Sequence, residues 1–166
     1  MKPKIVKIFE KIQKIPYGVC KFDKDNLDNI KEGDCRHKSE LLYRAFKKEG
    51  FETKKIKVIF DWKDTPVPKN LLEILKVSGT IWEHDSIEVK IKDKWIKVDC
   101  TWNQELQKLG FPITKNWDGQ SDTLQITNGK LSFFNIDNYK KNIKIVKEEA
   151  LAFADALNKW FSSARK

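Results

Sequence analysis

The chain has 166 residues, of which 40% are hydrophobic and 34% are charged, and its formal net charge is +9. This length can bury a core, so we expect a single domain over residues 1–166. No apolar run approaches the length of a membrane span, which excludes an integral membrane protein. The basic start, Met1-Lys2-Pro3-Lys4-Ile5, is not followed by the apolar core of a signal peptide.

The cysteines and the positive charge indicate the compartment and the partners of the protein. Cys20, Cys35 and Cys100 are odd in number and lack metal-ligand spacing, which favours free thiols in a reducing cytoplasm. The positive charge comes mainly from lysines scattered along the whole chain. Nucleic-acid readers usually present a clustered face that includes arginine forks. We therefore expect a solvated lysine surface, with neither a nucleic-acid partner nor a membrane partner.

Apolar residues at helical spacing predict a first helix over residues 4–15, which Pro16 closes. Residues 17–32 are mostly polar and are expected to form a loop. A second helix begins after Asp34, a good N-cap, and ends before Gly50, which suits a left-handed C-terminal cap.

Alternating residues after this helix predict a strand that carries Ile56, Val58 and Phe60 and ends near Asp61. A loop over 63–69 and a short helix over 70–76 follow. The stretch 82–102 then alternates as a β-hairpin with one apolar face, turning at Asp93-Lys94. We further expect a helical turn over 104–109, a long loop over 110–128 with a short strand at 123–126, and a final helix over about 144–163.

Cys35 falls in the first turn of the second helix. Unpaired N–H groups and the positive end of the helix dipole favour a thiolate there. This placement turns a cysteine into a nucleophile, although a buried structural thiol is the alternative interpretation. A nucleophilic thiol needs a base, and the chain has only two histidines, His37 and His84.

The positions of the two histidines on their predicted elements indicate which of them can serve as the base. His37 lies two residues after Cys35 on the same helix and therefore points roughly 200° away from it. His84 is on the first hairpin strand and Asp99 is on the second. A hairpin loop with an even number of residues places both on one face, opposite Val89 and Val98. A four-residue loop makes them diagonal neighbours, whereas a two-residue loop at Asp93-Lys94 leaves them four positions apart.

The chemistry then assigns roles. Asp99 orients one imidazole nitrogen of His84, and the other nitrogen takes the Cys35 proton. The thiolate attacks a carbonyl and forms a thioester that water or an amine resolves. The Cys35 backbone N–H is the expected first oxyanion donor, with Tyr17 and Gln13 as candidates for the second.

Three blocks of the sequence carry a resemblance to a known family. The blocks are Gly33-x-Cys35-x-x-Lys38-Ser39-x-Leu41-Leu42 with Gly50-Phe51, then His84-x-x-x-Glu88-Val89, then Lys94-Trp95-Ile96-x-Val98-Asp99-x-Thr101-Trp102. Together, over residues 31–102, the chain resembles the transglutaminase-like superfamily. The resemblance implies an α+β, papain-like core in which a nucleophile helix packs on an antiparallel sheet and the terminal helices pack on that core.

By the same resemblance, Cys35 is the nucleophile, His84 the base and Asp99 the orienting residue, while Trp95 and Trp102 pack around them. The family often has proline after the aspartate, where this chain has Cys100. The chain also lacks evident acidic loops of the kind found in the calcium-dependent animal cross-linkers of this family.

Other residues have structural interpretations. Cys100 is expected in the core and Cys20 as an incidental loop thiol. A zinc site from Cys35, His37, His84 and Cys100 is disfavoured by their spacing. Trp117 and Tyr17 are weak candidates for substrate binding, and Trp117 could equally fill the edge of the core.

The resulting hypothesis is a thiol enzyme that acts on a peptide or protein substrate without cofactor or metal. It would hydrolyse or transfer the acyl part of an amide through Cys35, His84 and Asp99. An inactive domain that binds a peptide or protein is the alternative, and an acetyl-CoA-dependent arylamine transferase is a third. The complete set of three residues favours an enzyme, because a binding module has no reason to retain all of them.

Overall fold

The computed structural model describes residues 1–20 and 27–166, and it has the mixed α+β class that was expected. Its centre is a four-stranded antiparallel sheet in the order β3-β2-β1-β4. The strands are β1 (Thr53–Asp61), β2 (Ile81–Ile91), β3 (Lys94–Val98) and β4 (Ser132–Asn135). The α-helices are α1 (Lys4–Gln13), α2 (Cys35–Lys48), α3 (Lys69–Leu72) and α4 (Lys147–Ala164). Three 3₁₀ turns complete the fold, η1 (Trp62–Asp64), η2 (Gln104–Leu109) and η3 (Ile136–Asn138).

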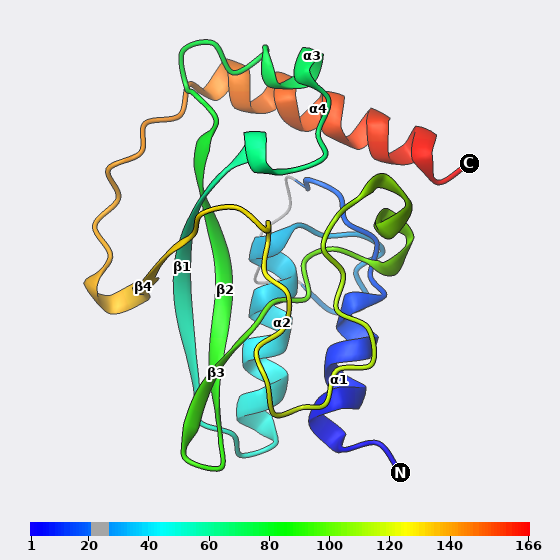
Figure 1. Cartoon of the computed structure of the whole chain (residues 1–166), viewed down its shortest axis with the longest axis vertical. Helices are drawn as coiled ribbons and strands as arrows, with labels where there is room; N and C mark the ends of the chain where they lie inside the picture. The colour runs from blue at the N-terminus through cyan, green and yellow to red at the C-terminus, as the bar shows by residue number, and fades with distance from the viewer. Residues whose placement is uncertain (21–26) are drawn as a thin grey trace.

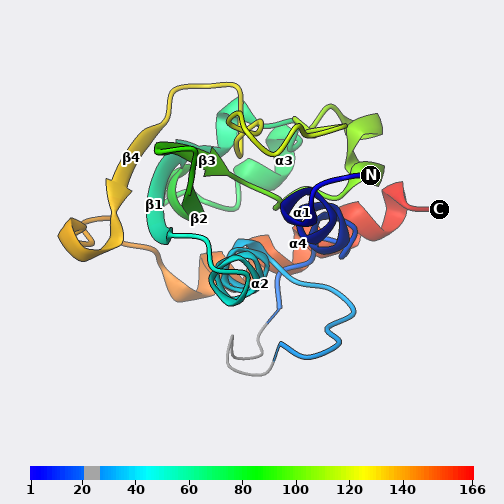
Figure 2. The ribbon, with the colours of Figure 1, turned by 90° about the horizontal axis from the view of Figure 1, so that it is seen from below.

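The helices α1 and α2 lie side by side against one face of the sheet (Figures 1 and 2). Each presents an apolar stripe at helical spacing, which packs with Ile87 and Val98 of the hairpin. Asp34 caps the N-terminus of α2, as predicted. At the other end of this helix, Gly50 has a φ of 86°, a conformation that favours glycine.

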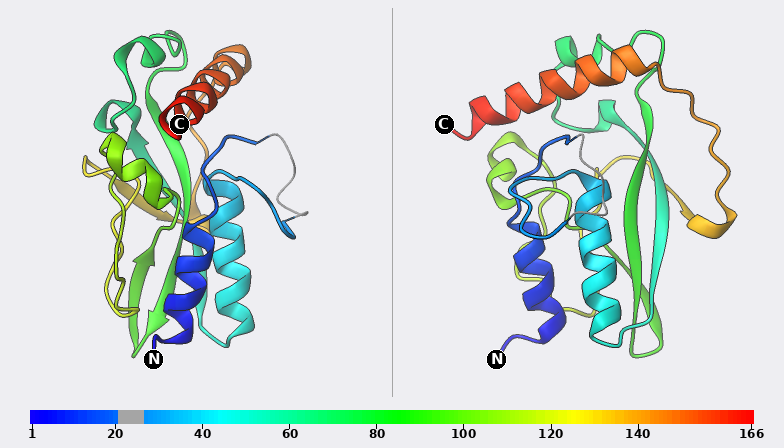
Figure 3. Two further views of the ribbon diagram at one scale, coloured as in Figure 1. Left: turned by 90° about the vertical axis from the view of Figure 1, so that its right-hand side faces the viewer. Right: turned by 180° about the vertical axis from the view of Figure 1, so that it is seen from behind.

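The hairpin has one apolar face, as predicted: Ile87, Val89, Ile96 and Val98 are buried, whereas Glu88, Lys90, Trp95 and Lys97 on the other face are partly exposed. Along β1, however, the second face of the sheet is buried as well. Ile56, Val58 and Phe60 point away from α1 and α2 into a second apolar cluster. The long segment after β3 covers this side, as the left view of Figure 3 shows, with Leu106 and Phe111 packed inside. Polar side chains on this face, such as His84, are therefore enclosed by protein.

The hairpin turn also differs from its prediction. β2 and β3 pair Ile91 with Lys94, so the two-residue loop is Lys92-Asp93, one position before the expected one. Both residues have positive φ, 47° and 63°, as a type I′ turn requires. A lysine is unusual at such a position, and this is why the sequence pattern misplaced the turn.

Three segments outside the hairpin differ from their predictions. No strand forms at 123–126; there the Thr123 N–H donates to the Lys97 carbonyl at 3.0 Å and its hydroxyl receives the Asp99 N–H. The strand β4 was not predicted, because it is short and its Phe133 and Phe134 are both exposed. The expected helix over 70–76 is a single turn, α3.

The helix α4 crosses one end of the sheet, above the start of α2 (Figures 1 and 3). Its Asn158 side chain accepts the Val19 N–H at 2.8 Å and donates to the Val19 carbonyl at 3.0 Å. Near its other end, Glu149 accepts the N–H groups of Val77 and Ser78. These bonds fix α4 over the site described next. Within the described residues, no helix is both long and apolar enough to cross a membrane.

Candidate active site

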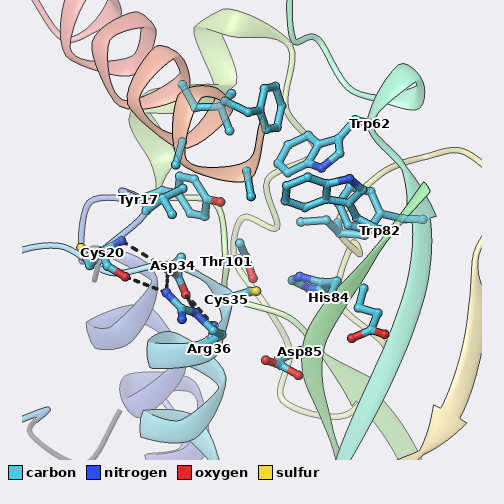
Figure 4. Close-up of a pocket in the computed structure, with 18 of the residues that line it drawn as sticks. Tyr17, Cys20, Asp34, Cys35, Arg36, Trp62, Trp82, His84, Asp85 and Thr101 are labelled. Carbon is cyan, nitrogen blue, oxygen red and sulfur yellow. Dashed lines mark hydrogen bonds and ion pairs between the residues drawn. The ribbon is translucent and has the colours of Figure 1, made fainter. Parts of the chain in front are cut away.

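The three residues singled out from the sequence lie together in the structure. Cys35 is the first residue of α2, His84 is in β2, and Asp99 directly follows β3. The His84 Nε2 and Asp99 Oδ2 atoms are 2.6 Å apart. The Cys35 sulfur faces the imidazole (Figure 4) and forms a hydrogen bond with it. The arrangement therefore runs from thiol to imidazole to carboxylate.

The hairpin register explains how His84 meets Asp99. The last ladder pair is Ile87 with Val98. Extending this register places Thr101 opposite His84, so Asp99 is the diagonal neighbour of His84 on the same face. This register was expected from a four-residue loop, but a two-residue loop at Lys92-Asp93 produces it.

Asp99 is held on several sides. Its Oδ1 accepts the Thr101 N–H at 2.9 Å, and its own N–H donates to the Thr123 hydroxyl at 2.8 Å. Burial opposes the charge on Asp99, but the charge of His84 and hydrogen bonds from His84 and Thr101 hold the pKa of Asp99 below its usual value. The long loop thus positions the carboxylate through Thr123, a role that the sequence did not indicate.

His84 is buried, with 2% of its surface exposed. Burial by itself lowers the pKa of this imidazole, because it disfavours the charged form. Electrostatic interactions with Asp99 and Cys35, with hydrogen bonds to both, outweigh burial and raise the pKa of His84 to about 10. The site therefore favours the protonated form of the imidazole.

The start of α2 is built around Asp34. Its carboxylate accepts the Arg36 N–H at 3.0 Å and binds the Arg36 guanidinium through both oxygens. Its own N–H donates to His37 Nδ1 at 3.1 Å, which completes a capping box. Burial opposes the Asp34 charge, but the bonds from His37 and Arg36 lower its pKa to about 2. His37 is thereby directed to the cap and away from Cys35.

Lys38 connects the site to its surroundings from inside the core. Its ammonium group donates to the carbonyl oxygens of Gln13, Ile15 and Thr101 at 3.1, 2.8 and 2.9 Å. Burial lowers the pKa of Lys38 to about 8. The side chain ties α2 to the end of α1 and to the segment beside Asp99, so it supports the relative placement of Cys35 and Asp99.

The remaining candidates separate into site and core. Tyr17 is held beside the start of α2 by a bridge to Gly33, and its hydroxyl points into the pocket (Figure 4). Gln13 donates instead to the Thr114 carbonyl at 2.9 Å and does not line the pocket. Trp117 is also outside the pocket lining and packs against Phe9, with ring centroids 4.9 Å apart. It takes the core position that was its alternative interpretation.

The other two thiols lie close to the site but are poor nucleophiles. Cys100 is 3% exposed in the core, as expected. Cys20 is buried as well, with its Sγ donating to the Gly18 carbonyl at 3.3 Å. Burial first, and then nearby carboxylates, raise the pKa of Cys20 to about 12. In the part of the chain that is described, no cluster of three or more His, Cys, Asp or Glu side chains could hold a metal ion.

A cavity of about 590 Å³ opens directly onto Cys35 and His84. Its walls come from several parts of the chain, including the loop of Tyr17, the start of α2, the strands β1 and β2, the turn η1 and the helix α4. Sequence reasoning missed the contributions of Trp62, Trp82 and α4. Trp82 lies two residues before His84 on β2, so the strand alternation could have placed it on the same face. The contact with α4 depends on tertiary packing, which no local sequence pattern indicates.

Comparison of the chain with protein-family models, with curated proteins and with solved structures found no match. The chemistry of the site therefore has to be argued from its own residues.

Proposed function

We propose that the protein is a thiol enzyme that hydrolyses or transfers the acyl part of a peptide or amide bond through Cys35, His84 and Asp99. The observation that carries this proposal is the buried His84, which lies between the Asp99 carboxylate at 2.6 Å and the Cys35 sulfur. A buried imidazole held between a carboxylate and a thiol at a helix start has the components of an activated nucleophile.

The reaction begins from a thiolate and an imidazolium. The Cys35 sulfur forms a bond to the substrate carbonyl carbon, and the carbonyl oxygen becomes an oxyanion. The Cys35 backbone N–H, at the helix start where no intrahelical acceptor exists, is the first donor to this oxyanion. The Tyr17 hydroxyl, which points into the pocket, is the better remaining candidate for the second donor, since Gln13 is bonded elsewhere.

His84 then gives its proton to the leaving amine as the carbon–nitrogen bond breaks, which leaves a thioester on Cys35. Water or a second amine enters, His84 accepts its proton, and the new bond to the acyl carbon releases the Cys35 thiolate. Asp99 keeps the imidazole oriented and stabilises its protonated form throughout.

The order of the three residues, their place on a helix start and a hairpin, and the sequence blocks around them support membership in the transglutaminase-like superfamily. A papain-like core is part of this proposal. Because that superfamily includes cross-linking transferases, proteases, amidases and inactive modules, the proposal fixes the reaction class more firmly than the substrate.

The test uses the alkylation of Cys35 by iodoacetamide, read by intact mass in a background in which Cys20 and Cys100 are replaced by serine. At about pH 6, where a free thiol is almost entirely protonated, Cys35 should react at least about tenfold faster than in the His84→Gln variant. Cys35→Ala should abolish labelling and leave the fold unchanged, because Cys35 is a partly exposed residue at the helix start.

Equal labelling rates with and without His84 would refute the enzyme proposal. The function to examine would then be peptide or protein binding by an inactive domain. A positive result leads to substrate screening, in which acetyl-CoA should be included because acylation of Cys35 by it would indicate an arylamine acetyltransferase.

A further inference from the structure

The cavity beside Cys35 is much larger than an attacking thiol needs, and its far wall is apolar. Away from the triad, the wall consists of Phe60, Trp62 and Trp82 on the sheet side and of Ala154, Phe153 and Leu157 on α4. We call these six residues the apolar wall. Trp62 and Trp82 extend into the space above His84 (Figure 4). A volume of about 590 Å³ can hold a group of the size of a substituted ring.

The charged residues that line the cavity near Cys35 are paired with one another, and the other two in the lining, Lys141 and Asp155, are exposed to solvent. Lys57 bonds to Asp85 and lies 4.0 Å from Glu83, and the Arg36 guanidinium binds the carboxylate of Asp34. Asp34, Arg36 and Asp85 lie on the side of the cavity nearest the thiol (Figure 4). A charged group that entered the apolar wall would lose its hydration without gaining an unpaired partner there. The cavity therefore favours a neutral group.

One polar atom in the apolar wall has no partner. Trp62 is 95% buried, since 5% of its surface is exposed, and its Nε1 donates to no acceptor among the described residues. The Trp82 indole nitrogen, by contrast, donates to the Gly79 carbonyl at 2.9 Å. The ring contact between Trp62 and Trp82, at 6.1 Å, supplies no oxygen or nitrogen acceptor. Buried donors nearly always have a partner, so a bound group that brings an acceptor to this N–H would satisfy it.

Resting on the proposed function, we propose that the apolar wall binds a neutral, ring-sized part of the substrate that carries one hydrogen-bond acceptor, which accepts from Trp62 Nε1. The substrate class is thus an amide whose acyl or neighbouring side chain is aromatic or bulky and bears a carbonyl or hydroxyl oxygen. Ring faces pack well against the edges of the Trp62, Trp82 and Phe153 rings, and the single acceptor fixes the orientation. Selectivity against a purely hydrocarbon group comes from the buried N–H that such a group leaves unpaired.

The test uses alkylating probes with one warhead and different tails, in the background with Cys20 and Cys100 replaced by serine. The probes are iodoacetamide, its N-(4-isopropylbenzyl) derivative, and the three positional isomers of its N-(acetylbenzyl) derivative. Acetyl and isopropyl groups have nearly the same shape but differ in the acceptor oxygen. Second-order rates of Cys35 labelling are measured by intact mass. These probes react by displacement of iodide, so no oxyanion forms and the tail effect is isolated.

The ring-bearing probes should label the wild type about tenfold or more faster than iodoacetamide does, because they bury a ring against the apolar wall. Ala154→Phe fills the cavity and should remove this acceleration, so that in this variant the ring-bearing probes react no faster than iodoacetamide does. Ala152→Phe, on the exposed side of the same helix, is the matched control and should behave as the wild type does. If the ring-bearing probes still react faster than iodoacetamide in Ala154→Phe, the proposal that they bind at the apolar wall is refuted.

The acceptor is tested by Trp62→Phe, which keeps a ring and removes the N–H. At least one acetyl isomer should react about threefold to tenfold faster than the isopropyl probe in the wild type, and this preference should vanish in Trp62→Phe. No preference for any of the three isomers, or an equal preference in Trp62→Phe, would overturn the role of Trp62.

The two proposals fail in different ways. If iodoacetamide labelling depends on His84 but no ring-bearing probe is accelerated, the enzyme proposal stands and the substrate class is refuted. If labelling is independent of His84 and ring-bearing probes are still accelerated, the cavity binds such groups but the enzyme proposal fails.

Discussion

The charge of Asp99 should be the main reason that His84 is protonated at neutral pH. Asp99→Asn is the sharpest perturbation, since it keeps the size of the side chain and removes its charge. At an effective dielectric constant of about 20, opposite unit charges about 4 Å apart attract by about 4 kcal/mol, which corresponds to about three pH units. In the wild type the pKa of His84 is raised from 6.5 to about 10. The His84 pKa of the variant should therefore lie at or below about 7.5, because burial still opposes the imidazolium charge and the remaining interaction with Cys35 compensates only in part.

Nuclear magnetic resonance of the imidazole nitrogens measures this pKa directly. The chain has only two histidines, so ¹⁵N-histidine labelling gives two sets of signals, and the spectrum of His84→Gln assigns them. The second set of signals comes from His37. This residue is hydrogen-bonded to the helix cap at Asp34, so its signals should not respond to the change at Asp99. A His84 midpoint that stays above about pH 9 in Asp99→Asn would refute the electrostatic account given above.

Three further predictions concern stability. Folding raises the pKa of His84, so the contribution of His84 to folding stability is complete below about pH 6.5 and is lost as pH rises through about 10. In thermal unfolding, the stability difference between the wild type and Asp99→Asn should therefore be largest near pH 6 and should shrink toward pH 10. Lys38→Met leaves three buried carbonyl groups unpaired and should cost about 3 to 5 kcal/mol in urea unfolding, whereas the exposed Lys48→Met should change stability by less than about 0.5 kcal/mol. Asn158→Ala removes two hydrogen bonds and should cost about 2 kcal/mol; a cost near zero would mean that the loop at Val19 holds its place without α4.

Local patterns predicted the elements that carry the triad. The cap at Asp34, the apolar period of α2 and the alternation of the hairpin depend on local sequence, so parity predicted His84 and Asp99 on one face for any loop with an even number of residues. The exact register escaped prediction because the turn uses Lys92 at positive φ, where the usual glycine signal is absent.

The cavity could not be predicted in the same way. Its apolar wall joins residues of η1, β2 and α4, which approach one another only through tertiary packing. The loop contact of Thr123 with Asp99 is similar, since a threonine in a polar segment carries no local sign of a distant partner. The buried state of Lys38 also depends on three carbonyl groups that belong to other segments.

The position of α4 in chain order has a consequence for biosynthesis. The residues of the triad lie between positions 35 and 99, whereas the roof of the cavity begins near residue 150. A ribosome makes the chain from its N-terminus, so Cys35, His84 and Asp99 are all synthesised before the helix that closes the cavity. Under the proposed function, the cavity that would select the substrate is complete only once α4 has been made and the hydrogen bonds between Asn158 and Val19 hold it in place.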